Sequence, residues 1–340
     1  MEFKVVVKSL SPIHIGSGER YPLFSILDNH RYDDEEIFRR FVEKKLSGKN
    51  IIELKDAYEI MEKFEDEIYD YAKSIKNSLQ PIYRIDELDE GVEEESKVSG
   101  VEETIKYLDK TQLKPMIPGS TLKGIFLTAW LYKVLKDKGN NLETILEAYV
   151  EENEKKKKRK KLEDVLSQPN LLEKYKEKIE NLLGTKLPTM GFSDCLLESY
   201  KIKVGKIFVG RARKFNIEVI DEFSGKFSLS VENEYELMKV MEALKVFAKD
   251  YFENVKGLME IGGGIREKIA EAEKMLENME SNEVIIIVGK FTNKYSKSLI
   301  SILPQSKRQK LQKPSRFLRY FSINERKMPI GLVKIKVEKE

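Results

Sequence analysis

The sequence predicts an α+β fold, and three features of its hydrophobic pattern support this class. From Lys201 onward apolar and polar residues alternate over several stretches, which is typical of antiparallel strands with one buried face. Long stretches with helical spacing stand between these strands, without the regular alternation of a parallel sheet. The C-terminal order of strand, strand, helix and strand is compatible with a ferredoxin-like unit.

Apolar spacing and helix-start signals place the elements of the N-terminal half. Acidic residues favour a helix N-terminus, and Ser or Thr can cap one. The predicted elements are a strand over 3–10, a helix opened by the acidic residues 33–36, an amphipathic helix over 55–76, a solvated acidic loop over 86–95, and a helix that begins at Ser120 or Thr121.

The C-terminal half shows the clearest strand patterns. Alternation with period two predicts successive antiparallel strands, and two amphipathic segments predict helices. The predicted strands are Ile202–Val209, Phe215–Val219, Phe227–Val231, 283–290 and 330–337, and the predicted helices cover about 237–251 and 266–279.

A chain of 340 residues suggests two domains. We expect an N-terminal region over 1–150, with a helical insertion at 34–110, and a C-terminal region over 191–340. The charged stretch between them, 151–190, contains the basic run 154–161, which we interpret as a solvated helix or insertion.

The composition limits the chemistry that the chain can perform. Lys and Arg number 61 and Asp and Glu 58, so the net charge of +3 does not by itself indicate a nucleic-acid partner. A single cysteine excludes an intrachain disulfide and a cysteine-based zinc site, and it fits a reducing, cytoplasmic compartment. No signal peptide and no apolar segment long enough to span a bilayer is apparent, so we expect no membrane partner. We also expect no metal and no cofactor.

Only two histidines are present, and His14 is the one near a motif. It could serve as a metal ligand, a general base or a hydrogen-bonded structural residue. Because no second histidine stands at a metal-binding spacing, we favour a structural histidine that orients the loop around it.

Three glycine-bearing loops are the candidate binding elements. Free amides at a helix start attract anions, Gly119 allows a close backbone approach, and Lys123 adds positive charge. None of the loops has the spacing of a nucleotide-binding motif, and ordinary turns are the alternative. The loops are 12–20, with His14, Gly16 and Gly18; 117–124, with Gly119, Ser120, Thr121 and Lys123; and 259–266, with Gly262, Gly263, Gly264 and Arg266.

Basic residues are concentrated in the C-terminal part of the chain. Between 301 and 340 there are eleven basic and only three acidic residues, and the aromatic residues Phe317, Tyr320 and Phe321 interleave with Arg316 and Arg319. This pattern suits phosphate pairing with base stacking, although the aromatic residues could equally be core residues. Arg211 belongs to a second basic stretch on a predicted hairpin.

The three loops together resemble a known family. The opening SLSPIHIGSGE, the central IPGSTLKG and the late IGGGIR resemble the RAMP (repeat-associated mysterious protein) subunits of CRISPR effector complexes. Their order and spacing are most similar to the fifth subunit of the type III-A Csm complex. The chain departs from the family pattern at Gly331-Leu332, where a Gly-Trp pair is usual.

This resemblance implies an RRM-like, ferredoxin-type RAMP fold, in one or two such units, and a non-catalytic role in binding CRISPR guide RNA. It implies that the chain caps the backbone filament near the guide 3′ end and supports guide maturation in antiviral defence. The implied partners are the guide RNA, a backbone RAMP subunit, the small subunit of the Csm complex, and host nucleases for 3′ trimming. The implied RNA-lining residues are those of the three loops named above.

Two alternatives remain open at this stage. The chain could be a metal-independent endoribonuclease that processes guide precursor RNA by general acid–base chemistry, with His14 and a Tyr or Lys helper as the candidates. It could also be a scaffold without RNA contact, in which case charge reversal of Lys123 and Arg266 would leave RNA retention unchanged.

Overall fold

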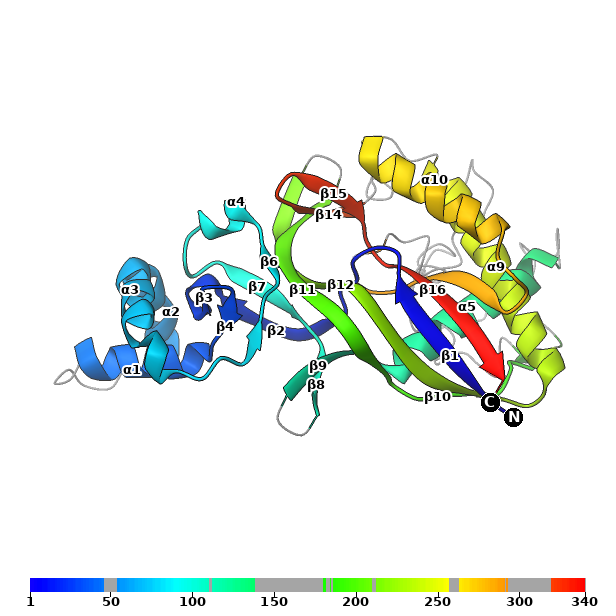
Figure 1. The fold of residues 1–340 in the computed structure, drawn as a ribbon, viewed down its shortest axis with the longest axis horizontal. Helices are drawn as coiled ribbons and strands as arrows, with labels where there is room; N and C mark the ends of the chain where they lie inside the picture. Colours follow the sequence, from blue (N-terminus) through cyan, green and yellow to red (C-terminus); the bar gives the residue numbers. More distant parts are fainter. Residues whose placement is uncertain are drawn as a thin grey trace, which may run out of the picture.

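The computed structural model of the chain describes residues 1–45, 54–109, 112–137, 180–181, 184, 186–209, 212–256, 263–290, 292 and 319–339. Its centre is one long, curled and mainly antiparallel sheet, with helices against one face and a smaller helical lobe at the far end from the two termini (Figure 1). Arg211, Gly262, Arg316 and the basic run 154–161 lie outside the described residues.

Thirteen described strands belong to the large sheet, in the order β13-β16-β1-β12-β11-β14-β15, with six short strands joined to its edges and ends. β3, β4 and β5 form a separate small sheet. The strands are β1 (Glu2–Ser9), β2 (Gly16–Pro22), β3 (Ile26–Leu27), β4 (His30–Arg31), β5 (Tyr83–Arg84), β6 (Glu87–Leu88), β7 (Gly100–Thr104), β8 (Lys106–Asp109), β9 (Gln112–Ile117), β10 (Met190–Phe192), β11 (Cys195–Val209), β12 (Ala212–Val231), β13 (Glu283–Ile287), β14 (Arg319–Ile323), β15 (Arg326–Pro329) and β16 (Leu332–Lys339).

Long amphipathic helices bury one face of this sheet. Alternate residues of β1 point into this core, and the rings of Tyr132 and Phe247 join two of the helices edge to face, 5.1 Å apart. The helices are α1 (Asp34–Lys45), α2 (Leu54–Lys63), α3 (Glu65–Ile75), α4 (Glu90–Glu93), α5 (Gly119–Asp137), α9 (Glu234–Lys256) and α10 (Gly263–Glu277).

The N-terminal lobe, which we define as residues 23–98, has a hydrophobic core of its own. Phe24, Ile37, Phe41 and Ile68 are among its buried residues, and none of them belongs to the main core. β2 and β7 lead from this lobe to the large sheet, where β7 pairs with β12 (Figure 1). The lobe is therefore attached to the sheet through β2 and β7, and through β6, which pairs with β11 in parallel register.

The predicted α+β class is confirmed, but several element boundaries were wrong. The strands expected at Phe215–Val219 and Phe227–Val231 are parts of the single strand β12, which bends at Glu222, where φ is +48°. The period-two pattern does not register such a bend, because alternation continues on both sides of it.

Two predictions for the N-terminal lobe also need correction. The helix expected over 55–76 is divided at Phe64 into α2 and α3. The segment 86–95, expected to be a solvated loop, contains β6 and α4, and the buried Asp89 caps α4 by accepting from the amide of Val92 at 3.1 Å. A short capped helix gives too few apolar positions for a periodic signal.

The strands of the two predicted regions share one sheet. β1 lies between β12 and β16 and pairs with both in antiparallel register. The boundaries at 150 and 190, and the division into two ferredoxin-like units, stay predictions.

Candidate nucleic-acid interface

His14 lies inside the protein, at the start of the first predicted loop. Its Nδ1 is 2.6 Å from the carbonyl oxygen of Glu218, and its Nε2 is 3.2 Å from Oε1 of Glu102. The side chain is fully buried. His14 therefore orients the loop, as the structural interpretation expected, and does not offer a free ring nitrogen to a ligand.

Glu102, on β7, holds two cations at the surface beside this loop. Its Oε1 accepts a hydrogen bond from Nζ of Lys290, and its Oε2 lies 3.8 Å from the guanidinium of Arg20. The Glu102 side chain is 4% exposed, whereas the side chains of Lys290 and Arg20 are 53% and 58% exposed. Burial alone would raise the pKa of Glu102, but the hydrogen bonds from Lys290 and His14 outweigh it and hold that pKa below its usual value. We call Arg20, Lys290 and Glu102 the cation pair site.

The glycines of the first loop have two different roles. A Cβ on Gly16 would lie 2.9 Å from Oε1 of Glu102 and 3.3 Å from Nε2 of His14, so a larger residue there would have to displace the Glu102 carboxylate. Gly18 has φ +96° and open space around it. The loop can thus pass close to the cation pair site and still turn outward at Gly18.

A second buried carboxylate, that of Glu218 on β12, lies in the protein interior next to the residues that hold the cation pair site. Its Oε2 accepts hydrogen bonds from the hydroxyls of Tyr21 at 3.0 Å and Tyr83 at 2.8 Å, and its Oε1 accepts one from Nζ of Lys106 at 2.5 Å. Burial raises the pKa of both tyrosine hydroxyls, and the nearby carboxylate raises it further. This network joins the lobe, β2, β8 and β12 in one rigid unit.

His14 should make the stability of the protein depend on pH. Burial lowers its pKa below 6.5, although the contacts with Glu218 and Glu102 oppose this shift. Because the unfolded chain then binds the proton more readily, stability should fall as the pH drops from about 7 through the lowered pKa, by at most about 1.4 kcal/mol per pH unit. Denaturant unfolding at pH 7, 6 and 5 measures this effect.

His30 provides the matched control for this experiment. It is the only other histidine in the sequence, and its side chain contacts a backbone carbonyl at an exposed position. His30→Gln should keep the loss of stability at acid pH, whereas His14→Gln should flatten it. A wild-type protein that gains stability on acidification over this range would contradict the lowered pKa.

The second predicted loop is a helix start that the protein itself caps. The amide of Gly119, the first residue of α5, donates to Oδ1 of Asp194 at 2.7 Å. Gly119 is buried, and a Cβ there would lie 2.6 Å from the carbonyl oxygen of Phe192. The expectation that this amide is open to a phosphate is therefore wrong, because Asp194 occupies it and Gly119 serves close packing. Ser120 and Lys123 are exposed, and Thr121 is half-buried.

The third predicted loop is only partly described. α10 begins at Gly263, so the helix starts three residues earlier than expected, and Gly264 lies within its first turn with open space around it. Arg266 is exposed. Among the described residues of this loop, a helix start and the cation of Arg266 are available to a ligand.

Arg319 opens β14, and its neighbours belong to the protein interior. Partial burial lowers the pKa of Arg319, while Tyr320 and Phe321 are buried. The ring of Tyr320 stacks on Phe208 at 5.2 Å. The suggestion that these aromatic residues stack on bases is wrong for Tyr320 and Phe321, because both fill hydrophobic cores.

The three loops lie against different parts of the sheet. The first contacts β7 and the end of β13, the second packs on the turn between β10 and β11, and the third starts a helix that packs on α9 and β15 (Figure 1). Glu102 and Lys290 were not identified from the sequence as residues of the first site. Arg20, which directly follows the SLSPIHIGSGE motif, was the only local sign of positive charge at this loop.

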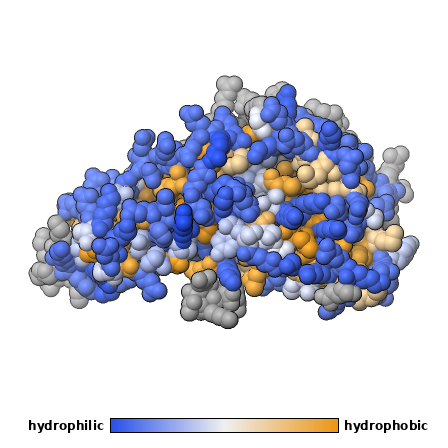
Figure 2. Space-filling view, viewed as in Figure 1, coloured by the Kyte–Doolittle hydropathy of each residue, from blue (hydrophilic) through white to orange (hydrophobic). Residues whose placement is uncertain are grey.

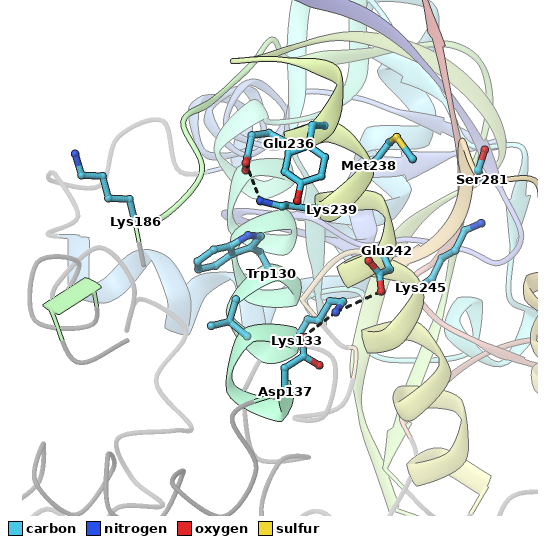
Figure 3. Close-up of a pocket in the computed structure, with 12 residues that line it drawn as sticks. Trp130, Lys133, Asp137, Lys186, Glu236, Met238, Lys239, Glu242, Lys245 and Ser281 are labelled. Atoms are coloured by element: carbon cyan, nitrogen blue, oxygen red, sulfur yellow. Dashed lines mark hydrogen bonds and ion pairs between the residues drawn. The ribbon is translucent and has the colours of Figure 1, made fainter. Parts of the chain in front are cut away.

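A surface groove of about 690 Å³ lies between α5 and α9 (Figure 3). Its charged side chains largely pair with each other: Lys133 with Asp137 and Glu242, and Lys239 with Glu236. The described residues contain no cluster of metal-ligating side chains. No helix in the described part of the chain is long and apolar enough to cross a membrane.

Fold and site together define an α+β protein built on a curled antiparallel sheet, with a glycine turn beside paired cations. The model of the RAMP superfamily matches residues 6–267, and the chain belongs to this superfamily. No curated protein matches the chain.

Two solved structures show the same fold. A chain of a cryo-EM structure of a Csm–crRNA–target RNA ternary complex from a type III-A CRISPR-Cas system has a TM-score of 0.62 and 17% identity, and the match covers 99% of this chain and 100% of that one. The crystal structure of T. onnurineus Csm5 has a TM-score of 0.55 and 17% identity, with 96% of this chain and 99% of that chain covered.

Proposed function

We propose that this chain is a non-catalytic guide-RNA-binding subunit of a type III-A CRISPR effector complex in the cytoplasm, and that it caps the backbone filament near the guide 3′ end. Membership of the RAMP superfamily and the fold shared with Csm subunits support the assignment. Its partners would be the guide RNA, a backbone RAMP subunit and the small subunit. Recruitment of host nucleases for 3′ trimming belongs to the same proposal.

The cation pair site is the observation that carries the RNA role. A buried carboxylate fixes Arg20 and Lys290 beside an open glycine turn, yet more than half of each side chain faces solvent. Cations held in this way can meet backbone phosphates without reading bases, as a guide of variable sequence requires. Ser120, Lys123 and Arg266 are exposed and would extend the contact, with Gly263, while the open space around Gly264 leaves the first turn of α10 accessible.

The endoribonuclease alternative has little support in this site. His14 was its candidate acid or base, but both ring nitrogens contact protein groups inside the core. A proton-transfer role would require at least one nitrogen to reach the RNA.

Loss of the cation pair should weaken binding to any single-stranded RNA. Because each phosphate contact contributes about 0.7 to the slope of log affinity against log salt, Arg20→Ala with Lys290→Ala should reduce that slope by about 1.4 and lower affinity roughly tenfold near 0.1 M salt. Fluorescence anisotropy with several unrelated RNAs of equal length measures both quantities. A strong sequence preference would contradict the proposal.

Arg39→Ala with Lys136→Ala is the matched control for the cation pair. Both side chains are similarly exposed, at 62% and 49%, and each pairs with a carboxylate, Glu43 and Asp250 respectively. This variant should bind RNA as the wild type does. If RNA affinity falls equally in both variants, the effect comes from net charge alone, and the cation pair site is not an RNA contact.

A further inference from the structure

The large sheet has a second face, opposite the helices. In β1 the residues Phe3, Val5 and Val7 are buried, whereas Lys4 and Lys8 are exposed and Val6 is half-buried. This alternation places the lysines on the side away from the helical core. Figure 2 looks onto this side, where hydrophilic residues are interspersed with apolar ones.

Lysines gather at one end of this face, near the end of β1. Lys8 lies directly opposite Lys334 of β16, and Val6 lies between Lys336 of β16 and Lys226 of β12. Side chains directly opposite each other on neighbouring strands are about 5 Å apart at Cβ, and like charges in that position are destabilising. We call Lys8, Lys226, Lys334 and Lys336 the lysine face.

The positive charge of the lysine face is only partly neutralised. Lys226 pairs with Glu198 at 3.0 Å, and Lys334 pairs with Glu283 at 2.9 Å. Within the part of the chain that the structure describes, Lys8 and Lys336 make no ion pair. The other acids of this face, Glu2 and Glu338, lie at the opposite end of β1 with Lys4. An anion is therefore the complementary partner for this end.

The remaining side chains of this face suit phosphates rather than bases. Ser224, Ser228 and Ser230 of β12 stand opposite the residues of β1 and add hydroxyl groups. At the described positions of β1, β12 and β16 that share this face, no aromatic side chain is available for base stacking. Lysine and serine without aromatic residues indicate contacts with a phosphate backbone.

We propose that the lysine face binds the backbone of single-stranded RNA as a second contact region, separate from the cation pair site. Lys8 is next to the end of β1, from which the chain continues into the loop with His14 and Gly16. One RNA strand can thus use both regions in succession. This inference rests on the proposed function, because it takes RNA as the ligand.

Lys8→Gln with Lys336→Gln tests this inference in the full chain. The neutral, similarly long side chains remove two charges, so the salt dependence on a twenty-nucleotide polyuridine RNA should lose about 1.4 in slope. Affinity near 0.1 M salt should fall roughly tenfold. Lys249→Gln with Lys274→Gln, at exposed positions of α9 and α10, removes the same charge elsewhere and should leave binding unchanged.

Stability distinguishes loss of a contact from loss of the fold. Because Lys8 faces Lys334 whereas Lys336 faces Glu283, the two substitutions should have opposite and small effects on stability, and the double variant should melt close to the wild-type temperature. If RNA binding stays unchanged in this folded variant, the lysine face has no RNA contact and the inference fails. Unchanged RNA binding with lost assembly onto partner subunits would assign the face to an acidic protein surface and would also overturn it.

The cation pair variant separates this inference from the proposed function. If only the cation pair variant loses RNA binding, the lysine face is not an RNA contact, but the proposed function is still supported. If both variants lose RNA binding, the inference and the proposed function are both supported. If the wild-type protein does not bind the polyuridine RNA, the inference and the proposed function both fail.

Discussion

Glu218→Ala is expected to destabilise the protein by about 3–5 kcal/mol, because the buried Lys106 ammonium loses one of its two carboxylate partners and keeps only Glu103, at 3.2 Å. The side chains of Glu218 and Lys106 are 0% and 3% exposed. The hydroxyls of Tyr21 and Tyr83 would lose the same acceptor. An unsatisfied buried group costs far more than an exposed ion pair contributes.

The effect should concentrate where the lobe meets the sheet. Tyr83 belongs to β5 of the lobe, and Tyr21 and Lys106 flank it on β2 and β8. Removing the shared carboxylate should loosen this junction before the main core unfolds. Denaturant unfolding measures the overall loss, and limited proteolysis should show earlier cleavage within residues 23–98.

Glu198→Ala provides the comparison for Glu218→Ala. Glu198 also accepts from a lysine, Lys226 at 3.0 Å, but both side chains are about half exposed. Its loss should cost at most about 1 kcal/mol. Similar costs for the two variants would show that the Glu218 network is not what holds the junction together.

The general architecture could be predicted from the sequence where residues close in the chain determine it. α9 was expected over 237–251 and extends over Glu234–Lys256, because its buried residues repeat at helical spacing and Asn233 accepts from the amide of Glu236. Strands β1, β13 and β16 were likewise expected within a few residues of their ends.

The site was less predictable, because it depends on partners far apart in the sequence. Glu102 is 188 residues from Lys290, and Glu218 is 197 residues from Tyr21. No local pattern marks such pairs. At Gly119 the sequence correctly predicted a helix start. It could not show that Asp194, 75 residues away, accepts the hydrogen bond from the Gly119 amide.

Gly289→Ala is expected to destabilise the protein by about 2–6 kcal/mol and to disrupt the cation pair site. Gly289 has φ +108°, where other residues pay about 1–3 kcal/mol of strain. A Cβ would also lie 2.6 Å from the carbonyl oxygen of His14, and overpacking of this kind adds about 1–3 kcal/mol.

The site should suffer because Gly289 directly precedes Lys290. The amide of Lys290 donates to the carbonyl of His14 at 2.7 Å, and this bond keeps the end of β13 against the first loop. A methyl group at Gly289 must push the two segments apart, which moves the Lys290 ammonium away from Glu102. RNA affinity should therefore fall, by less than in the Arg20→Ala, Lys290→Ala variant, because Arg20 keeps its place beside Glu102.

Gly18→Ala separates strain from displacement. Gly18 also has a positive φ, +96°, but a Cβ there meets nothing within 4 Å. It should cost only the strain of about 1–3 kcal/mol and leave Lys290 in place. Equal losses of RNA affinity in the two alanine variants would mean that the contact between β13 and the first loop does not position the cations. A larger loss in Gly289→Ala would identify that contact as what aligns Lys290 with Arg20.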